Sequence, residues 1–159
     1  MDLKQLYQDI ILEHGKSPRN LGKCKGYNRN AKGYNPLCGD KVHVYLKIDS
    51  KKKVKGLSFE GEGCAISLAS ASIMTESVKG KSFEETKEIM NAFLNMIKNT
   101  SQIQSNNLDE DQKTKLMSLS GVKEFPMRVK CATLSWHTLV SAMEDIKKKK
   151  EEVNTEAID

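Results

Sequence analysis

The chain has 159 residues, 38% of them hydrophobic, and a formal net charge of +5. This length and composition predict one domain with a sizeable core, residues 1–150, and a polar, disordered tail, residues 151–159. The start lacks an apolar run and no segment is long enough to cross a bilayer, which predicts a cytoplasmic protein with no membrane partner. The lysines are dispersed among acidic residues, so a nucleic-acid partner is not expected either.

The first predicted helix has apolar residues at three-and-four spacing: Leu3, Leu6, Tyr7, Ile10 and Ile11. We expect Gly15 to end this helix and Pro18 to prevent its continuation. His14, in the last turn, is expected to bond terminal carbonyl groups and not a metal. Cys24, which follows, has no other ligand type at metal spacing and is interpreted as an ordinary thiol.

Three strands of an antiparallel sheet are predicted next. Residues 27–34 are polar and alternate weakly, as in an edge strand, and residues 35–40 form a turn. The clearest strand is 42–48, where apolar and polar residues alternate with a period of two. The returning strand, 54–59, changes phase at Gly56, which indicates a β-bulge.

A stretch of small residues, 61–76, leads from this strand into a helix. Glycines at 61 and 63 let the strand end sharply and place Cys64 at the helix N-terminus. The unpaired backbone amides at that end favour thiolate over thiol. Alanine and serine fill most of the next two turns, so other elements can pack closely on both sides of this helix.

Three further helices are predicted in the second half of the chain. A Ser-x-x-Glu capping box at Ser82 begins one of them, and residues 109–119 form a short one that Gly121 stops. The last helix is expected to open at Cys131, with His137 outside its apolar stripe and exposed.

Three cysteines and one aspartate lie at the ends of these predicted elements: Cys38 and Asp40 in one turn, and Cys64 and Cys131 each at a helix start. Their wide spacing does not fit the disulfide framework of a small secreted domain. Three thiolates and a carboxylate form a tetrahedral donor set suited to zinc or an iron–sulfur cluster. The spacing alone leaves open a second interpretation, in which these are separate buried structural thiols.

Three motifs carry a resemblance to a known family: Asn-Pro-x-Cys-Gly-Asp at 35–40, Gly-x-Gly-Cys-x-Ile-Ser-x-Ala-Ser-Ala-Ser at 61–72 and Arg-x-Lys-Cys-Ala-Thr-Leu-x-Trp at 128–136. Together they resemble the IscU/NifU family of iron–sulfur cluster assembly proteins, and most closely its SufU branch. The resemblance covers nearly the whole chain. It implies an α+β fold, with a small antiparallel three-stranded sheet, helices packed over it and a metal site at one exposed end.

The resemblance also implies residue roles. Cys38, Asp40, Cys64 and Cys131 match the family's metal-ligand positions, which hold zinc in the SufU branch. Cys38 matches the cysteine that accepts sulfur from a SufS-type cysteine desulfurase, and Asp40 is expected to act with it in catalysis. Lys130 stands where the cluster scaffolds carry histidine, which favours sulfur transfer over stable cluster assembly.

The main hypothesis is therefore a zinc-dependent sulfurtransferase that accepts persulfide sulfur on Cys38 and passes it to downstream iron–sulfur assembly proteins. It would act as the partner of a cysteine desulfurase and not as a stand-alone enzyme. The alternative is a scaffold on which a [2Fe–2S] cluster is assembled and transferred to apo-proteins. A third hypothesis, a zinc-stabilised domain that binds nucleic acid through its lysines, would need a clustered basic stripe that the sequence lacks.

Overall fold

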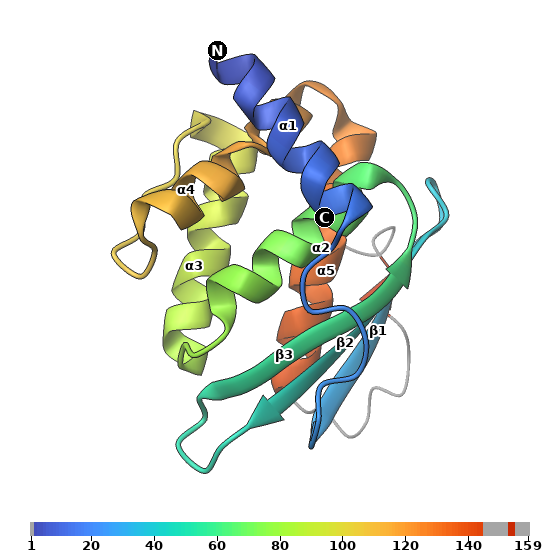
Figure 1. Cartoon of the computed structure of the whole chain (residues 1–159), viewed down its shortest axis with the longest axis vertical. Coiled ribbons are helices and arrows are strands. Elements are labelled where there is room, and N and C mark those ends of the chain that lie inside the picture. The colour runs from blue at the N-terminus through green and yellow to red at the C-terminus, as the bar shows by residue number, and fades with distance from the viewer. Residues whose placement is uncertain (1, 145–152, 155–159) are drawn as a thin grey trace.

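The computed structural model describes residues 2–144 and 153–154 of the chain. Three antiparallel strands form a sheet in the order β3-β2-β1, and a two-residue strand, β4, pairs in parallel with β1. The helices lie over one face of this sheet (Figure 1), which confirms the predicted α+β fold. In chain order the elements are α1 Leu3–Lys16, β1 Arg29–Asn35, β2 Asp40–Ile48, β3 Val54–Glu62, α2 Ala65–Val78, α3 Phe83–Asn95, the π-helical turn η1 Met96–Thr100, α4 Glu110–Met117, the 3-10 turn η2 Ser120–Glu124, α5 Pro126–Glu144 and β4 Val153–Asn154.

The core lies between the sheet and two helices, α2 and α5. Alternate residues of β2, namely Val42, Val44 and Leu46, are buried and face α5, which also packs on β1. Helix α2 packs on β3 and on α5, while α3 and α4 lie on the side of the molecule away from the sheet (Figure 1). The period of two in β2 thus correctly predicts which of its residues enter the core.

Helix α2 is buried on nearly every side, as its small residues predict. The Oγ atom of Ser70 donates a hydrogen bond of 2.5 Å to the carbonyl of Ala132 in α5 and accepts one of 3.2 Å from Trp136 Nε1. On the opposite side, a Cβ at Gly15 of α1 would lie 3.3 Å from Ala65. Small side chains at these contacts allow the three helix backbones to approach closely.

Several local predictions are confirmed. The capping box is present, since Ser82 Oγ accepts from the Glu85 backbone N–H at 3.1 Å and Glu85 Oε1 accepts from the Ser82 N–H at 2.9 Å. The sheet register shifts between Lys47 and Ile48, opposite residues 54–56, where the phase slip at Gly56 predicts a bulge. Gly80, with φ of +88°, follows the end of α2 and stops it.

Some predicted boundaries are wrong. Gly15 lies inside α1, which continues to Lys16, and Gly121 lies inside η2, after α4 has already ended at Met117. Cys131 does not open α5, because that helix begins at Pro126. Proline fits the first position of a helix, where its missing N–H needs no partner, so the five residues before Cys131 are helical.

Two histidines also depart from expectation. His14 is buried, and its Nδ1 bonds the Ser72 hydroxyl of α2 at 2.7 Å instead of terminal carbonyl groups. Its Nε2 lies 3.7 Å from Glu76, and burial lowers the pKa of His14. His137 is half-buried and not exposed, because α5 is enclosed by the core on most of its circumference.

The predictions for the end of the chain fall mostly outside the described residues. Ile146, the last residue of the predicted apolar stripe, is among these, and so is most of the predicted tail, 151–159. Within that tail, Val153 and Asn154 pair with Gly33 and Tyr34 of β1.

Candidate metal centre

The β1–β2 turn, the end of β3 and the first turns of α2 and α5 lie at the same end of the molecule (Figure 1). Asn35 and Asp40 pair across the antiparallel ladder and so hold the two ends of the turn that carries Cys38. Gly39 in this turn has φ of +69°, an angle that favours glycine. Cys38 is half-buried, whereas Asp40 is fully buried as the first residue of β2.

The residues between β3 and α2 bring a second ligand candidate toward Asp40. Gly63 has φ of +150°, and a Cβ built on it would lie 2.2 Å from Asp40 Oδ1. Only glycine therefore fits at position 63, because any side chain there would clash with the Asp40 carboxylate. The backbone N–H of the next residue, Cys64, donates a hydrogen bond of 2.9 Å to the same oxygen.

Cys64 is the N-cap residue of α2, as the sequence predicts. Its Sγ accepts a hydrogen bond from the backbone N–H of Ser67 at 3.4 Å. A hydrogen bond from the Cys131 thiol, with help from the backbone N–H of Ser67, lowers the pKa of Cys64 to about 6. The thiolate form is thus favoured at this position.

Cys131 approaches from the second turn of α5 and is fully buried. Its Sγ lies 3.2 Å from Cys38 Sγ and 3.5 Å from the side-chain nitrogen of Asn35. Its hydrogen bond to Cys64, together with burial, raises the pKa of Cys131.

Three of the four predicted ligands form a compact group. One side-chain atom from each of Cys38, Asp40 and Cys131 lies within 4.8 Å of the others. Cys64 is not part of this group, but its backbone N–H donates to Asp40 Oδ1 at 2.9 Å, so it lies beside the group. The compact group thus holds two sulfurs and one carboxylate, donor types that bind metal ions in proteins, with a third sulfur beside it.

Cationic groups lie beside this acidic cluster. The exposed guanidinium of Arg128 has its pKa raised by the Cys64 thiolate and by a hydrogen bond to Cys131. Lys41 Nζ lies 5.9 Å from the centre of the Tyr34 ring, next to the turn. Positive charge of this kind would offset the negative charge of thiolates and a carboxylate gathered around a divalent ion.

One residue of the site was missed by the sequence reasoning. Asn35 is fully buried, and its side-chain nitrogen donates to Asp40 Oδ2 at 3.1 Å as well as contacting Cys131. The signal was present in the sequence, because Asn35 is the first residue of the same motif that contains Cys38 and Asp40. Cys24, by contrast, lies against the Tyr45 carbonyl at 3.8 Å and belongs to no metal-binding group in residues 2–144.

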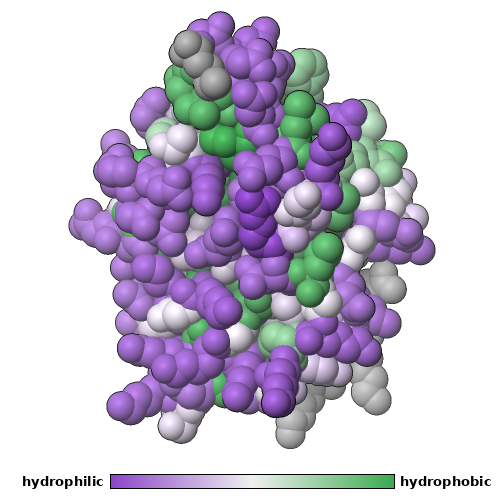
Figure 2. Space-filling model, in the orientation of Figure 1, coloured by the Kyte–Doolittle hydropathy of each residue, from purple (hydrophilic) through white to green (hydrophobic). Residues whose placement is uncertain are grey.

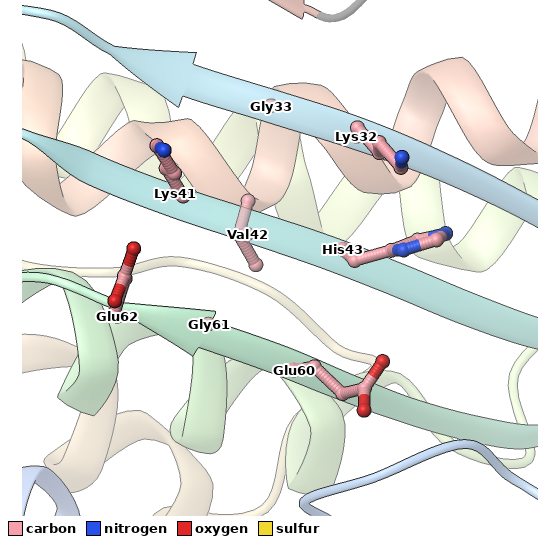
Figure 3. Close-up of a pocket in the computed structure, with 8 residues that line it drawn as sticks. All are labelled: Lys32, Gly33, Lys41, Val42, His43, Glu60, Gly61 and Glu62. Carbon is pink, nitrogen blue, oxygen red and sulfur yellow. The ribbon is translucent and has the colours of Figure 1, made fainter.

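Two surface grooves border this end of the molecule. A groove of about 730 Å³ between α1 and the η2–α5 segment is mostly apolar and includes Tyr7, Ile66, Phe125 and Arg128. In the surface view, hydrophobic side chains gather around the start of α1 at the top of the molecule, and further ones lie along the right-hand side of a largely hydrophilic face (Figure 2). A second groove, of about 380 Å³, crosses the sheet and carries Lys32, Lys41, His43, Glu60 and Glu62 (Figure 3), so charges of both signs line it.

Comparison with known proteins identifies the family. Residues 6–132 match the model described as the NifU-like N terminal domain. The zinc-dependent sulfurtransferase SufU of Bacillus subtilis (strain 168) is 39% identical over 141 residues, which cover 87% of this chain and 89% of SufU. The iron–sulfur cluster assembly scaffold protein IscU of Streptococcus pyogenes serotype M1 is 36% identical over 141 residues, which cover 89% of this chain and 84% of IscU.

Solved structures agree with this result. The crystal structure of FiSufU from Fervidobacterium islandicum AW-1 has a TM-score of 0.74 and 34% identity, and the match covers 87% of this chain and 97% of FiSufU. The N-terminal domain of a NifU-like protein from Brucella abortus shares the fold, with a TM-score of 0.77 at 22% identity, over 92% of this chain and 98% of that one.

The chain therefore belongs to the NifU-like N-terminal domain family, which includes the SufU and IscU proteins of iron–sulfur cluster assembly. Among the described helices, none has the length and apolar character needed to span a membrane.

Proposed function

We propose that this protein is a zinc-dependent sulfur-transfer partner of a SufS-type cysteine desulfurase, and that Cys38 accepts the sulfur. The observation that best supports this proposal is the position of Cys38. It lies in an exposed, glycine-containing turn and yet only 3.2 Å from the buried Cys131 thiol. A thiol in this place can both join a metal site and be reached by a second protein.

The other three proposed ligands are less accessible or more firmly held. Asp40 and Cys131 are fully buried, and Cys64 is fixed at the N-terminus of α2. A bound zinc ion would keep the thiolates deprotonated without changing its own oxidation state. Asp40 is held as the first residue of β2, whereas Cys38 lies in the turn before that strand and is only half-buried.

The transfer step is a thiolate exchange. The Cys38 thiolate attacks the terminal sulfur of a persulfide on the desulfurase, a new S–S bond forms on Cys38, and the desulfurase cysteine leaves as a thiolate. The exposed cation of Arg128, beside the thiols, supports this chemistry because it offsets the negative charge of the attacking and leaving thiolates. The apolar groove next to Arg128 offers a protein partner a surface close to the site.

The decisive experiment adds catalytic amounts of the zinc-loaded protein to a SufS-type desulfurase and measures release of alanine from cysteine. We expect the wild-type protein and Cys24→Ser to stimulate the desulfurase equally, and Cys38→Ser to give no stimulation. Mass spectrometry should then find the added sulfur on the Cys38 peptide. Absence of stimulation by the zinc-loaded wild-type protein would refute the proposal.

The second candidate function is a scaffold for a [2Fe–2S] cluster on the same residues. It is supported by the similarity to the scaffold protein IscU of Streptococcus pyogenes, whose 36% identity to this chain is close to the 39% of SufU. Anaerobic reconstitution with iron and sulfide, followed by visible spectroscopy, distinguishes the two functions. A stable chromophore that transfers to an apo-protein would favour the scaffold, whereas we expect no lasting chromophore.

A further inference from the structure

We propose that Asn35 is a positioning residue of the metal centre: its side-chain amide holds Asp40 and Cys131, two ligand candidates from different elements, in the arrangement that a metal ion requires. This inference rests on the metal centre of the proposed function. It adds a residue whose role is to orient ligands and not to bind the metal itself.

The hydrogen-bonding chemistry of Asn35 matches the metal-bound state of the site. Its amide nitrogen lies 3.1 Å from Asp40 Oδ2 and 3.5 Å from Cys131 Sγ. A carboxylate and a thiolate can only accept hydrogen bonds, and an amide NH₂ group has two hydrogens to donate. The amide therefore serves both ligands when both are deprotonated, which is the form that coordinates a metal.

The contacts of Asp40 show why this orientation matters. One carboxylate oxygen accepts from Asn35, and the other accepts from the backbone N–H of Cys64 at 2.9 Å. The carboxylate is thus held from β1 on one side and from the start of α2 on the other. Each oxygen keeps a further lone pair, so the carboxylate remains able to bind a metal while it is fixed.

Cys38 is held differently. It lies in the exposed turn after Asn35, and its Sγ contacts the Cys131 thiol at 3.2 Å. The amide of Asn35 therefore fixes Asp40 and Cys131 and leaves Cys38 as the ligand able to exchange. This division of the site into fixed and exchangeable ligands is what a sulfur acceptor on Cys38 needs.

The other end of the Asn35 side chain argues against a purely structural role. Its Oδ1 atom is buried and has no hydrogen-bond partner among the described residues. A buried acceptor without a partner lowers stability, and a leucine of similar size would remove that cost while leaving Asp40 Oδ2 without its donor. The presence of asparagine at position 35, despite its unpartnered Oδ1, is explained by the hydrogen bonds that its amide nitrogen makes to Asp40 and Cys131.

The test compares Asn35→Leu with a matched control, Asn30→Leu, on the same strand. Asn30 is exposed and bonds His43, away from the metal centre. For each protein we would measure zinc affinity by competition with a chromogenic chelator, the visible spectrum of the cobalt-substituted form, and the melting temperature of the apo-protein. We expect Asn35→Leu to bind zinc about 10- to 100-fold more weakly and to have an altered cobalt spectrum. The melting temperature of its apo-protein should fall, because the buried Asp40 carboxylate loses a hydrogen-bond donor. The control should match the wild type in zinc affinity and cobalt spectrum.

Alkylation provides a second readout. In the zinc-loaded wild type, iodoacetamide should modify Cys38 first while zinc stays bound. In zinc-loaded Asn35→Leu it should also modify Cys131 and release the zinc, because that ligand is no longer held.

Two results would overturn the proposal: an unchanged zinc affinity and cobalt spectrum in Asn35→Leu, or a loss of zinc affinity with an unchanged cobalt spectrum, which would mean that the ligands keep their arrangement without Asn35. If the leucine variant does not fold, Asn35→Ser carries the same test, since its shorter hydroxyl cannot reach both ligands. None of these measurements uses a desulfurase. A wild-type protein that binds zinc but does not stimulate the desulfurase would therefore refute the proposed function and leave the role of Asn35 intact.

Discussion

Gly63, whose backbone packs against Asp40, provides the sharpest test of the site's geometry. In Gly63→Ala, the new Cβ would lie 2.2 Å from Asp40 Oδ1 and 3.0 Å from the Asp40 Cα. The second of these atoms belongs to the backbone at the start of β2 and cannot rotate away. The backbone angle, φ of +150°, is also one that residues with a side chain rarely adopt. Either the chain before α2 or the start of β2 must move.

The expected cost follows from these two effects. Backbone strain of this kind costs about 1–3 kcal/mol, and forcing an extra carbon into a packed site costs about 1–3 kcal/mol more. The free energy of unfolding should therefore fall by about 2–6 kcal/mol, which lowers the melting temperature of a chain of this length by roughly 4–24 °C. Zinc affinity should fall as well, because the substitution moves Asp40 and Cys64 apart.

Two other glycines serve as controls in thermal unfolding monitored by circular dichroism. Gly80→Ala tests backbone strain alone, since φ there is +88° and nothing lies within 4 Å of the new Cβ. Gly121→Ala tests neither effect, because it has open space and no left-handed angle, and should leave the melting temperature nearly unchanged. If Gly63→Ala melts no lower than Gly80→Ala and keeps its zinc, the close packing of this loop on Asp40 is wrong.

Further predictions concern the ligands and the buried histidine. Cys64→Ser and Cys131→Ser should lose zinc and melt at lower temperature, because each leaves an incomplete ligand set, whereas Cys24→Ser should match the wild type in metal analysis and melting. Asp40→Ala should remain folded and retain zinc through three thiolates, but lose most stimulation of the desulfurase; normal stimulation would remove Asp40 from the mechanism. Burial lowers the pKa of His14, so the unfolded chain takes up a proton first, at about pH 6.5. The free energy of unfolding should therefore be highest above that pH and decrease as the pH falls below it. Urea titrations on either side of about pH 6.5 measure this decrease. The decrease should be smaller in His14→Gln than in the wild type.

Short-range sequence signals fixed most of the elements. The alternation in 42–48, the capping box at Ser82 and the phase slip at Gly56 each depend on neighbours in the chain, and each is confirmed. Predictions failed where a tertiary contact outweighed local propensity. Gly15, for example, stays helical because its missing side chain lets α1 pack on Ala65, and a glycine signal alone cannot distinguish packing from termination.

The sequence also determined which residues could form a metal centre, because their chemical types and motifs can be recognised without a structure. It did not determine how they are held. Only the tertiary structure places Cys131 in the second turn of α5, brings its Sγ to Cys38 across 93 positions of the chain, and sets the Asn35 amide between Asp40 and Cys131. These contacts join two strands, the turn between them and one helix, and depend on how that helix packs on the sheet, which no local pattern in the sequence encodes.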